Sequence, residues 1–368
     1  MVVMRWEAQE PKAAGSEDAL LALQGVVRSV KTPEFAGITF HEVLSKSALN
    51  KVGKTSGMPF GWTINPYRGC SHACVYCFAR KTHTYLDLDS GLDFDSQLIV
   101  KTNIAEVLRR ELARPSWQHE HVAMGTNTDP YQRAEGRYAL MPGIIKALAA
   151  SGTPFSILTK GTLLARDIPL LKSAGQDTEI GMGISLALLD PELAHRVEPG
   201  TPAPKARLEL ISRLRDAGLP CSVMAMPILP WLTDGDESLD ALFGALAAAG
   251  ATGVTAGALH LRPGAREWYL AFIARDYPHL AGKYARLYGG GTYASKEYRQ
   301  WLAGRVQFFK KKHGFTAKAQ FLPSRSDSAG RPEQPTRVTA ASSAVTGVSG
   351  SGPSGVSGLS GPAAQTLF

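Results

Sequence analysis

The sequence predicts an α/β protein in which parallel strands alternate with helices. Between residues 57 and 260, short apolar runs of strand-forming residues alternate with amphipathic stretches of helical period. This alternation is typical of βα units, whose strands pair in parallel beneath covering helices. Six strands and five intervening helices fit a partial (β/α)6 barrel, and patterning alone does not separate it from a doubly wound open sheet.

The expected elements alternate along the chain. Strands are expected at the apolar β-rich runs, at 63–67, 122–125, 155–159, 179–186, 222–226 and 253–259. Helices are expected at the amphipathic stretches, at 75–83, 138–150, 163–174, 205–217 and 238–249. The residues before the first strand are mixed in character, with one short apolar helix candidate at 19–30.

These elements divide the chain into four parts. They are an N-terminal extension (1–56), the α/β domain (57–261), a basic, aromatic-rich cap (262–322) and a Ser/Gly/Ala-rich tail (323–368). From 338 to 368 the tail has no charged side chain, and it has too little apolar surface to offset the entropy lost on ordering. We therefore expect a disordered tail without a catalytic role.

Composition predicts a water-soluble protein of the reducing cytoplasm. The chain has 368 residues, 44% of them hydrophobic, which is enough for one large core or two modest ones. It has no uncharged apolar stretch of membrane-spanning length, and its first residues lack the apolar region of a secretory signal. With only four cysteines and no such signal, a disulfide framework is not expected.

Three of the four cysteines, Cys70, Cys74 and Cys77, fall within one short run. Their C-x3-C-x2-C spacing turns three thiolates toward one point, which suits a metal or an iron–sulfur cluster. A cubane cluster with three protein ligands leaves one iron free to bind another molecule. A structural zinc site wants four ligands, which His72 or His83 would have to complete. The alternative to a catalytic cluster is therefore a zinc-stabilised nucleic-acid-binding protein without catalysis.

Small polar residues follow the carboxyl ends of the expected strands, where either architecture places its active site. They are Thr126, Asn127, Thr128 and Asp129 after the second strand, Lys160 after the third, and Ser185 in the fourth. Such a rim suits a zwitterionic, ribose-bearing cofactor. Each residue also has a structural interpretation: 127–130 could be only a turn, Lys160 could lie in a capping turn, and Ser185 could be a core hydroxyl.

The residues around the cysteine run resemble those of the radical S-adenosylmethionine (SAM) enzymes. The chain reads N-P-Y-R-G-C at 65–70 and C-F-A-R at 77–80. Within these enzymes it is most similar to the branch related to spore photoproduct lyase, with its N-P-Y-x-G-C-x-x-x-C-x-Y-C pattern. The resemblance implies a partial (β/α)6 TIM-like barrel and a [4Fe-4S] cluster on Cys70, Cys74 and Cys77, with SAM on the open iron. It also implies reductive cleavage of SAM to methionine and a 5′-deoxyadenosyl radical that abstracts hydrogen from a substrate.

Weaker motifs extend the resemblance over about 65–230. The T-K pair at 159–160 resembles one whose lysine approaches SAM, and Ser185 resembles a serine of the fourth strand. The E-P-G-T segment at 198–201, with Arg207 six residues on, resembles an element entering the next helix. The resemblance implies that SAM is bound by Tyr76 beside its adenine and by Thr126, Asn127, Thr128, Asp129, Lys160, Ser185 and Arg207. It also implies an electron donor of the flavodoxin or ferredoxin type.

One departure concerns the substrate. Spore photoproduct lyases carry a cysteine at the end of the second strand that donates a hydrogen atom to the product radical, and 125–129 has none. Cys221, at the start of the fifth strand, is expected to be a buried small hydrophobe. The resemblance therefore predicts how the radical is made and leaves the substrate open.

The cap contains a strongly basic segment. Residues 262–318 include twelve Lys and Arg, three Asp and Glu, and twelve aromatic residues. Positive charge interleaved with aromatic rings suits a polyanion with stackable bases, which makes DNA or RNA a candidate partner. The alternative is that these aromatics pack helices closing the open side of the barrel and that the lysines are solvated. The aromatics in question are Tyr277, Tyr284, Tyr288, Phe308 and Phe309.

Overall fold

Two β-sheets organise the part of the chain that the computed structural model describes, residues 26–53, 57–86 and 88–315. The larger sheet has the order β11-β10-β9-β8-β7-β4-β3. Its strands are β3 (Leu49–Lys51), β4 (Trp62–Ile64), β7 (Val122–Met124), β8 (Phe155–Thr159), β9 (Ile180–Ser185), β10 (Cys221–Ile228) and β11 (Gly253–Ala258). All neighbours from β4 to β11 run parallel, and β3 is an antiparallel edge. The predicted α/β class, a partial (β/α)6 barrel, is confirmed.

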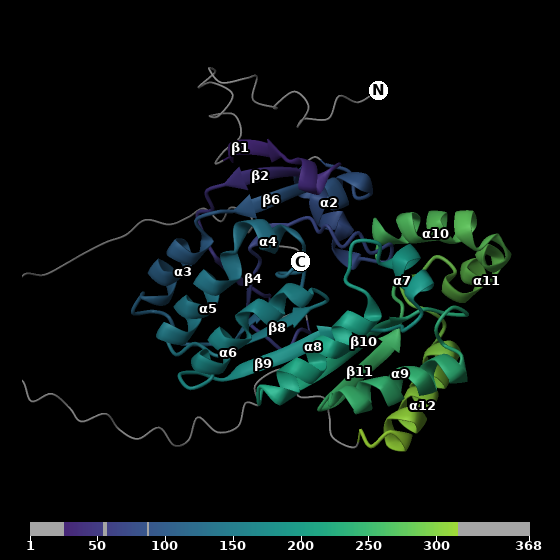
Figure 1. The fold of residues 1–368 in the computed structure, drawn as a ribbon. Helices are drawn as coiled ribbons and strands as arrows, with labels where there is room; N and C mark the ends of the chain where they lie inside the picture. The colour runs from purple at the N-terminus through teal and green to yellow at the C-terminus, as the bar shows by residue number, and fades with distance from the viewer. Residues whose placement is uncertain (1–25, 54–56, 87, 316–368) are drawn as a thin grey trace, which may run out of the picture. The chain divides into compact units, whose positions relative to one another are not determined.

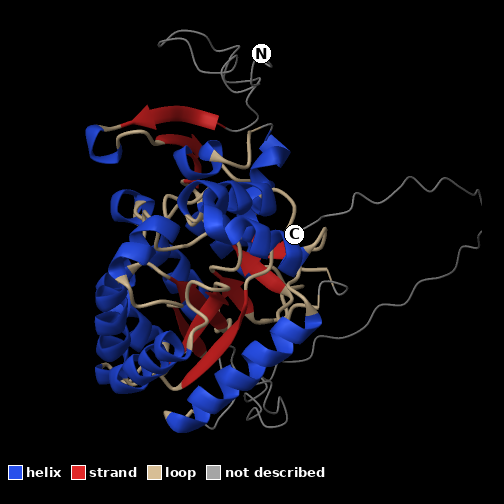
Figure 2. Cartoon of the chain, turned by 90° about the vertical axis from the view of Figure 1, so that its right-hand side faces the viewer, coloured by secondary structure: helices blue, strands red, loops and turns tan. Residues whose placement is uncertain are grey.

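Helices cover the outside of this sheet, whose strands lie inside (Figure 2). They are α3 (Ile104–Leu112), α4 (Ala134–Tyr138), α5 (Leu140–Ala150), η4 (Thr162–Asp167), α6 (Ile168–Ala174), α8 (Pro204–Asp216) and α9 (Asp236–Ala249). The helix α7 (Pro191–Val197) packs instead in one cluster with the cysteine run and the cap. The strands are continuous apolar runs because both faces are buried, as in β7, where every residue is buried. The helices bury one stripe each, such as Leu239, Leu242, Phe243 and Leu246 of α9, and each such side chain contributes about 1.5–3 kcal/mol.

A second, four-stranded sheet lies at the top of Figure 1, with the order β1-β2-β6-β5. Its strands are β1 (Val26–Lys31), β2 (Thr39–Val43), β6 (Gln97–Lys101) and β5 (Tyr67–Arg68). The helix expected at 19–30 is therefore wrong in its described part, because the β-branched alternation of β1 pairs antiparallel with β2. The rest of that candidate lies outside the described residues.

Short helical segments connect the second sheet to the cysteine run. They are η1 (Pro33–Phe35), η3 (Phe78–Leu86) and α2 (Leu92–Ser96). The helix expected at 75–83 is instead the 3-10 segment η3, which begins only after the third cysteine. The backbone before it is occupied by the turns that hold the cysteines, so a regular helix cannot start earlier.

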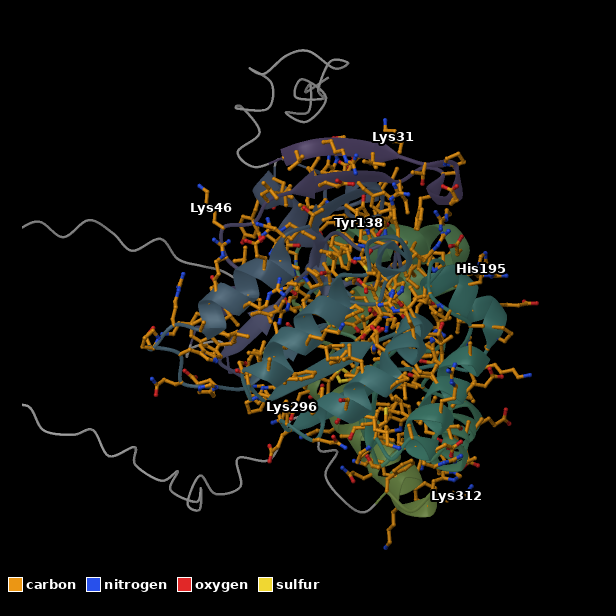
Figure 3. All side chains as sticks on the ribbon, turned by 60° about the vertical axis from the view of Figure 1, so that its left-hand side comes forward. Lys31, Lys46, Tyr138, His195, Lys296 and Lys312 are labelled. Carbon is orange, nitrogen blue, oxygen red and sulfur yellow. The ribbon has the colours of Figure 1, made fainter. Side chains whose placement is uncertain are left out.

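Three helices of the cap follow β11: α10 (Ala265–Asp276), α11 (Pro278–Tyr288) and α12 (Lys296–Lys312). Figure 1 shows α10 and α11 together on one side of the sheet, with α12 beside α9. Figure 3 labels Lys296 and Lys312, the two ends of α12. Among the cap aromatics, Tyr284, Tyr288 and Phe309 are buried and Phe308 is 55% exposed, so most of the rings pack.

Among the described helices, none combines the length and apolar character that a bilayer crossing requires. The tail at 323–368, expected to be disordered, lies outside the described residues.

Candidate active site

The cysteine run forms two consecutive turns between β5 and η3. Cys70, Cys74 and Cys77 all carry free thiols, and the first two are buried. The Ala73 amide donates to the Cys70 carbonyl at 3.1 Å, and the Cys77 amide donates to the Cys74 carbonyl at 3.2 Å. Ala73 has a φ of +53°, a left-handed conformation that closes the first turn. The turns gather the three cysteines on one short stretch of backbone.

Neighbouring segments hold this loop from both sides. Gln132 accepts a hydrogen bond from the Ser71 amide at 2.8 Å and donates one to the Gly69 carbonyl at 3.0 Å. The Gly200 amide donates to the His72 carbonyl at 3.0 Å. A Cβ on Gly200 would lie 1.9 Å from the Ser71 carbonyl oxygen, so only glycine permits this approach. The loop is therefore fixed by side-chain and backbone contacts from distant parts of the chain.

The three thiols influence one another electrostatically. Burial, and to a smaller extent the Cys70 thiol, raise the pKa of Cys77 to about 11. Burial likewise raises the pKa of Cys74 well above its ordinary value, with Glu198 adding to the effect. Thiols in such a place become thiolates only when a cationic centre binds them. This set of three free thiols, largely buried and close enough to shift one another's pKa, fits an iron–sulfur cluster. No group of three or more His, Cys, Asp or Glu in the described ranges meets the geometry of a site for a single metal ion.

A network of charged side chains lies next to the loop, centred on Glu198. Lys160 donates to the Ser185 hydroxyl at 2.6 Å and lies 3.3 Å from a Glu198 carboxylate oxygen. Arg207 donates to the other Glu198 oxygen at 2.6 Å and to the Ser185 carbonyl at 3.0 Å. The Tyr76 hydroxyl donates to Glu198, and the Lys160 ammonium lies 5.8 Å from the Tyr76 ring centre. Four predicted site residues therefore meet in one place.

The charge of this network is fixed by its geometry. Burial alone would raise the pKa of Glu198, but Lys160 and Arg207 lower it to about 2. The carboxylate is therefore ionised and offsets one of the two cations. One positive charge is left over at the edge of the network, with Lys160 its more accessible cation at 13% side-chain exposure. An anionic group of a ligand would be stabilised there.

Asp129 connects the segment after β7 to the end of β8 through hydrogen bonds. Its carboxylate accepts hydrogen bonds from the Thr159 hydroxyl, the Lys160 amide at 2.7 Å and the Tyr131 amide at 2.9 Å. His72 Nδ1 lies 3.3 Å from the same carboxylate. Burial lowers the pKa of His72, but Asp129 and Cys70 raise it to about 10. The Asp129 carboxylate is thus engaged by protein groups and links the cysteine loop to the Lys160 strand.

The other residues after the second strand take different positions. The Thr128 hydroxyl is buried and donates to the Tyr67 carbonyl at 2.8 Å, so it holds the segment leading into the cysteine run. Thr126 and Asn127 are half-buried in the turn after β7. In the part of the chain that the structure describes, neither makes a side-chain hydrogen bond to the Glu198 network. Cys221 is buried at the start of β10, as expected of a small hydrophobe.

Sequence reasoning did not assign Glu198, Gln132 or Arg80 to the site. Glu198 lies in the quoted E-P-G-T motif, and the nearby Lys160 and Arg207 were a signal that a buried carboxylate was needed. Gln132 gave no signal, because its role depends on contacts with residues more than sixty positions earlier. Arg80 lies in the quoted C-F-A-R segment and is fully buried against the Cys74 carbonyl.

The fold and this site define the class of protein. The family model described as "Radical SAM superfamily" matches residues 64–242, which contain the cysteine loop and the Glu198 network. Residues 64–242 of this chain therefore form a radical SAM domain.

Relatives of this chain are found in bacteria and in an archaeon. Uncharacterised proteins of Mycobacterium tuberculosis and Mycobacterium bovis are 56% identical over 338 residues, which is 90% of this chain and 99% of each relative. An uncharacterised protein of Methanocaldococcus jannaschii is 25% identical, over 52% of this chain and 70% of that protein.

Solved structures of spore photoproduct lyase share the fold. The complex with dinucleoside spore photoproduct has a TM-score of 0.55 and 15% identity, over 75% of this chain and 79% of that one. A double mutant with bound AdoMet (SAM) and dinucleoside spore photoproduct also has a TM-score of 0.55 and 15% identity, over 77% and 82%. At this identity the likeness shows a shared fold, and the fold implied by the resemblance to spore photoproduct lyase is confirmed.

Proposed function

We propose that this protein is a radical SAM enzyme whose [4Fe-4S] cluster is held by Cys70, Cys74 and Cys77. The observation that carries the proposal is the position of three free thiols, two of them buried and the third half-buried, beside the Lys160–Glu198–Arg207 network. When bound and reduced, such a cluster supplies the electron that cleaves SAM to methionine and a 5′-deoxyadenosyl radical. The protein supplies the ligands, orients SAM and keeps water from the reacting atoms.

We propose that the Glu198 network binds the polar part of SAM. Lys160 presents an ammonium group that Ser185 and Glu198 hold in place, which suits the SAM carboxylate. The Tyr76 ring lies within reach of the same ammonium and offers a face to adenine. Arg207 is fully buried, so it acts by fixing Glu198 and the Ser185 carbonyl. Asp129 and Thr128 brace the loop, while Thr126 and Asn127 stay predictions for SAM contact.

The experiment is anaerobic reconstitution with iron and sulfide, followed by dithionite and SAM. We expect about four irons per chain and formation of 5′-deoxyadenosine. Cys74→Ala should lose the cluster and the product. Cys221→Ala is the matched control, because Cys221 is also buried but lies in β10 away from the loop, and it should keep both. A fully loaded wild type that makes no 5′-deoxyadenosine would contradict the proposal.

We further propose that the substrate is held by the basic cap (262–322) and that a nucleic acid is the candidate. In support, exposed rings of the cap carry cations over them: Arg299 lies 5.7 Å from the Tyr293 ring centre and Arg305 lies 5.2 Å from that of Phe308. Such cation-bearing rings can stack with bases. Several cap cations are already paired, as Lys312 is with Asp240, which lowers the charge available to a polyanion.

Salt-dependent binding to single-stranded DNA and RNA tests this partner. Replacing Lys310 and Lys311 by Gln should weaken binding and lower the salt slope by about one for each phosphate that is no longer neutralised. Arg275→Gln is the control, because its guanidinium pairs with Asp276 on the protein surface. Equal binding by the wild type, the Lys310 and Lys311 variant and Arg275→Gln would contradict the proposal that the cap binds nucleic acid.

We also propose that the enzyme acts in the cytoplasm and that it receives electrons from a donor of the flavodoxin or ferredoxin type. Both follow from a cluster that must be reduced and that oxygen would destroy. Reduction of the reconstituted cluster by a flavodoxin or a ferredoxin, followed spectroscopically without dithionite, tests the donor.

A further inference from the structure

Arg80 is a fully buried arginine directly behind the cysteine loop. None of its surface is exposed. Burying a guanidinium is costly unless every donor finds a partner, and here the partners come from three parts of the chain. Nη2 donates to the Cys74 carbonyl at 3.0 Å, and Nη1 donates to the Gly91 carbonyl at 2.8 Å. Arg80 is thus bound to the backbone of a residue that the proposed function makes a cluster ligand.

The charge of Arg80 is paired with the carboxylate of Asp95, which contacts the same nitrogen as the Cys74 carbonyl. Its Nη2 also donates to both oxygens of Asp95, at 3.0 and 2.9 Å, and the Asp95 side chain is 16% exposed. The cation is therefore in contact with the loop, whereas its counter-charge lies toward solvent. Water screens the partly exposed carboxylate more than it screens the fully buried guanidinium. The loop experiences the pair as a net positive charge.

Two aromatic rings cover the Arg80 guanidinium. The guanidinium carbon lies 4.8 Å from the Trp268 ring centre and 5.3 Å from that of Phe94. Trp268 belongs to α10, the first helix of the cap, and Phe94 belongs to α2. A charge enclosed by rings acts through a lower effective dielectric than one in water, so it acts more strongly on its surroundings.

We propose that Arg80 is a positioning residue that raises the reduction potential of the cluster bound by Cys70, Cys74 and Cys77. The inference rests on the proposed function, because it requires that cluster. Reduction by one electron makes the cluster more negative, so a nearby buried cation stabilises the reduced state more than the oxidised state. Asp95 acts in the opposite direction and sets how much of the Arg80 charge the cluster experiences.

The sign of this effect distinguishes it from a structural role. Arg80→Gln removes the cation and should make the cluster harder to reduce. Asp95→Asn removes the counter-charge and should make it easier to reduce. Arg80→Lys keeps the charge and should stay near the wild type. A residue that only holds the loop in shape would give losses of the same sign in both neutral variants.

The experiment is a redox titration of reconstituted protein with mediators, read by the paramagnetic signal of the reduced cluster. For Arg80→Gln we expect at least a tenfold fall in the equilibrium constant for reduction, which is about 59 mV for one electron. For Asp95→Asn we expect this equilibrium constant to rise, and for Arg80→Lys we expect it to stay within threefold of the wild-type value. The matched controls are Arg275→Gln and Asp276→Asn, a surface pair of the same kind, which should not change the potential.

Two outcomes would overturn the inference. In one, the reduction potentials of Arg80→Gln and Asp95→Asn shift in the same direction. In the other, the equilibrium constant for reduction changes by less than twofold in both variants. If Arg80→Gln does not hold a cluster, the other two variants decide. A higher reduction potential in Asp95→Asn together with an unchanged potential in Arg80→Lys supports the inference, and any other result overturns it. A wild type that assembles a cluster and cleaves SAM, with variants of unchanged potential, contradicts only the role of Arg80. A wild type that does neither contradicts the proposed function.

Discussion

Replacing Glu198 by Gln removes one charge from the centre of the site and keeps the shape of the side chain. Glu198 has no side-chain exposure, and its partners Lys160 and Arg207 have 13% and 0%. The substitution therefore leaves two cations near each other without their shared carboxylate. Removing one partner of a buried ion pair costs about 3–5 kcal/mol of unfolding free energy.

The pKa of Glu198 gives a consistent magnitude. In the folded protein it is lowered from 4.5 to about 2. At 1.36 kcal/mol per unit, the ionised carboxylate contributes about 3 kcal/mol of stability at neutral pH. Because the folded-state pKa is the lower one, this contribution is complete above pH 4.5 and is lost as the pH falls through 2.

Urea unfolding of the cluster-free protein, followed by circular dichroism, measures this difference. At pH 7 Glu198→Gln should unfold with about 3–5 kcal/mol less free energy than the wild type, and the gap should narrow below pH 4.5. Glu192→Gln is the control, since Glu192 lies exposed on the adjacent helix α7 and should change stability by no more than about 0.5 kcal/mol. A loss below about 1 kcal/mol for Glu198→Gln would refute the argument that the carboxylate balances two buried cations.

Two further predictions concern the loop and its support. Gly200→Ala should lower the unfolding free energy by about 1–3 kcal/mol or more and should also lower iron incorporation, because the new Cβ would overlap the Ser71 carbonyl. The control Gly290→Ala lies in open space and should change neither quantity. A normal iron content in Gly200→Ala would contradict the close approach of Gly200 to the loop. His83 donates through Nε2 to the Gln97 carbonyl at 2.9 Å, and burial lowers its pKa from 6.5 to about 4. Stability should therefore be complete above pH 6.5 and fall by about 3 kcal/mol as the pH drops through 4, and His83→Gln should lose most of this pH dependence in urea unfolding. His195→Gln, at the exposed α7 position labelled in Figure 3, should keep it.

The parallel strands could be predicted from the sequence because they are buried on both faces. The expected strand at 155–159 matches β8, and those at 122–125, 179–186, 222–226 and 253–259 differ from the observed strands by one or two residues at their ends. The expected strand at 63–67 is wrong in its length, because it runs from β4 into β5, which belongs to the other sheet. The smaller sheet could not be predicted, because its strands are short or polar and gain their stability from pairing across distant segments. β5 has only two residues, one of them Arg68, and it pairs with β6 about thirty residues later.

The candidate site shows the same division. The cysteine run and the strand-end residues Lys160 and Ser185 are visible in the sequence because their spacing and position carry the signal. The contacts of Glu198, Gln132 and Arg80 depend on how the chain returns to the loop, which no local pattern encodes. Glu198 approaches Tyr76 across more than one hundred residues, for example. The sequence therefore revealed which groups bear the chemistry better than which groups hold them.

The most direct test of the central claim is a single-turnover measurement on the reconstituted, dithionite-reduced protein with excess SAM under anaerobic conditions. The account predicts 5′-deoxyadenosine and methionine in equal amounts from the wild type and from Cys221→Ala, and none from Cys74→Ala. A wild-type protein with a complete, reducible cluster and bound SAM that forms no 5′-deoxyadenosine would contradict it.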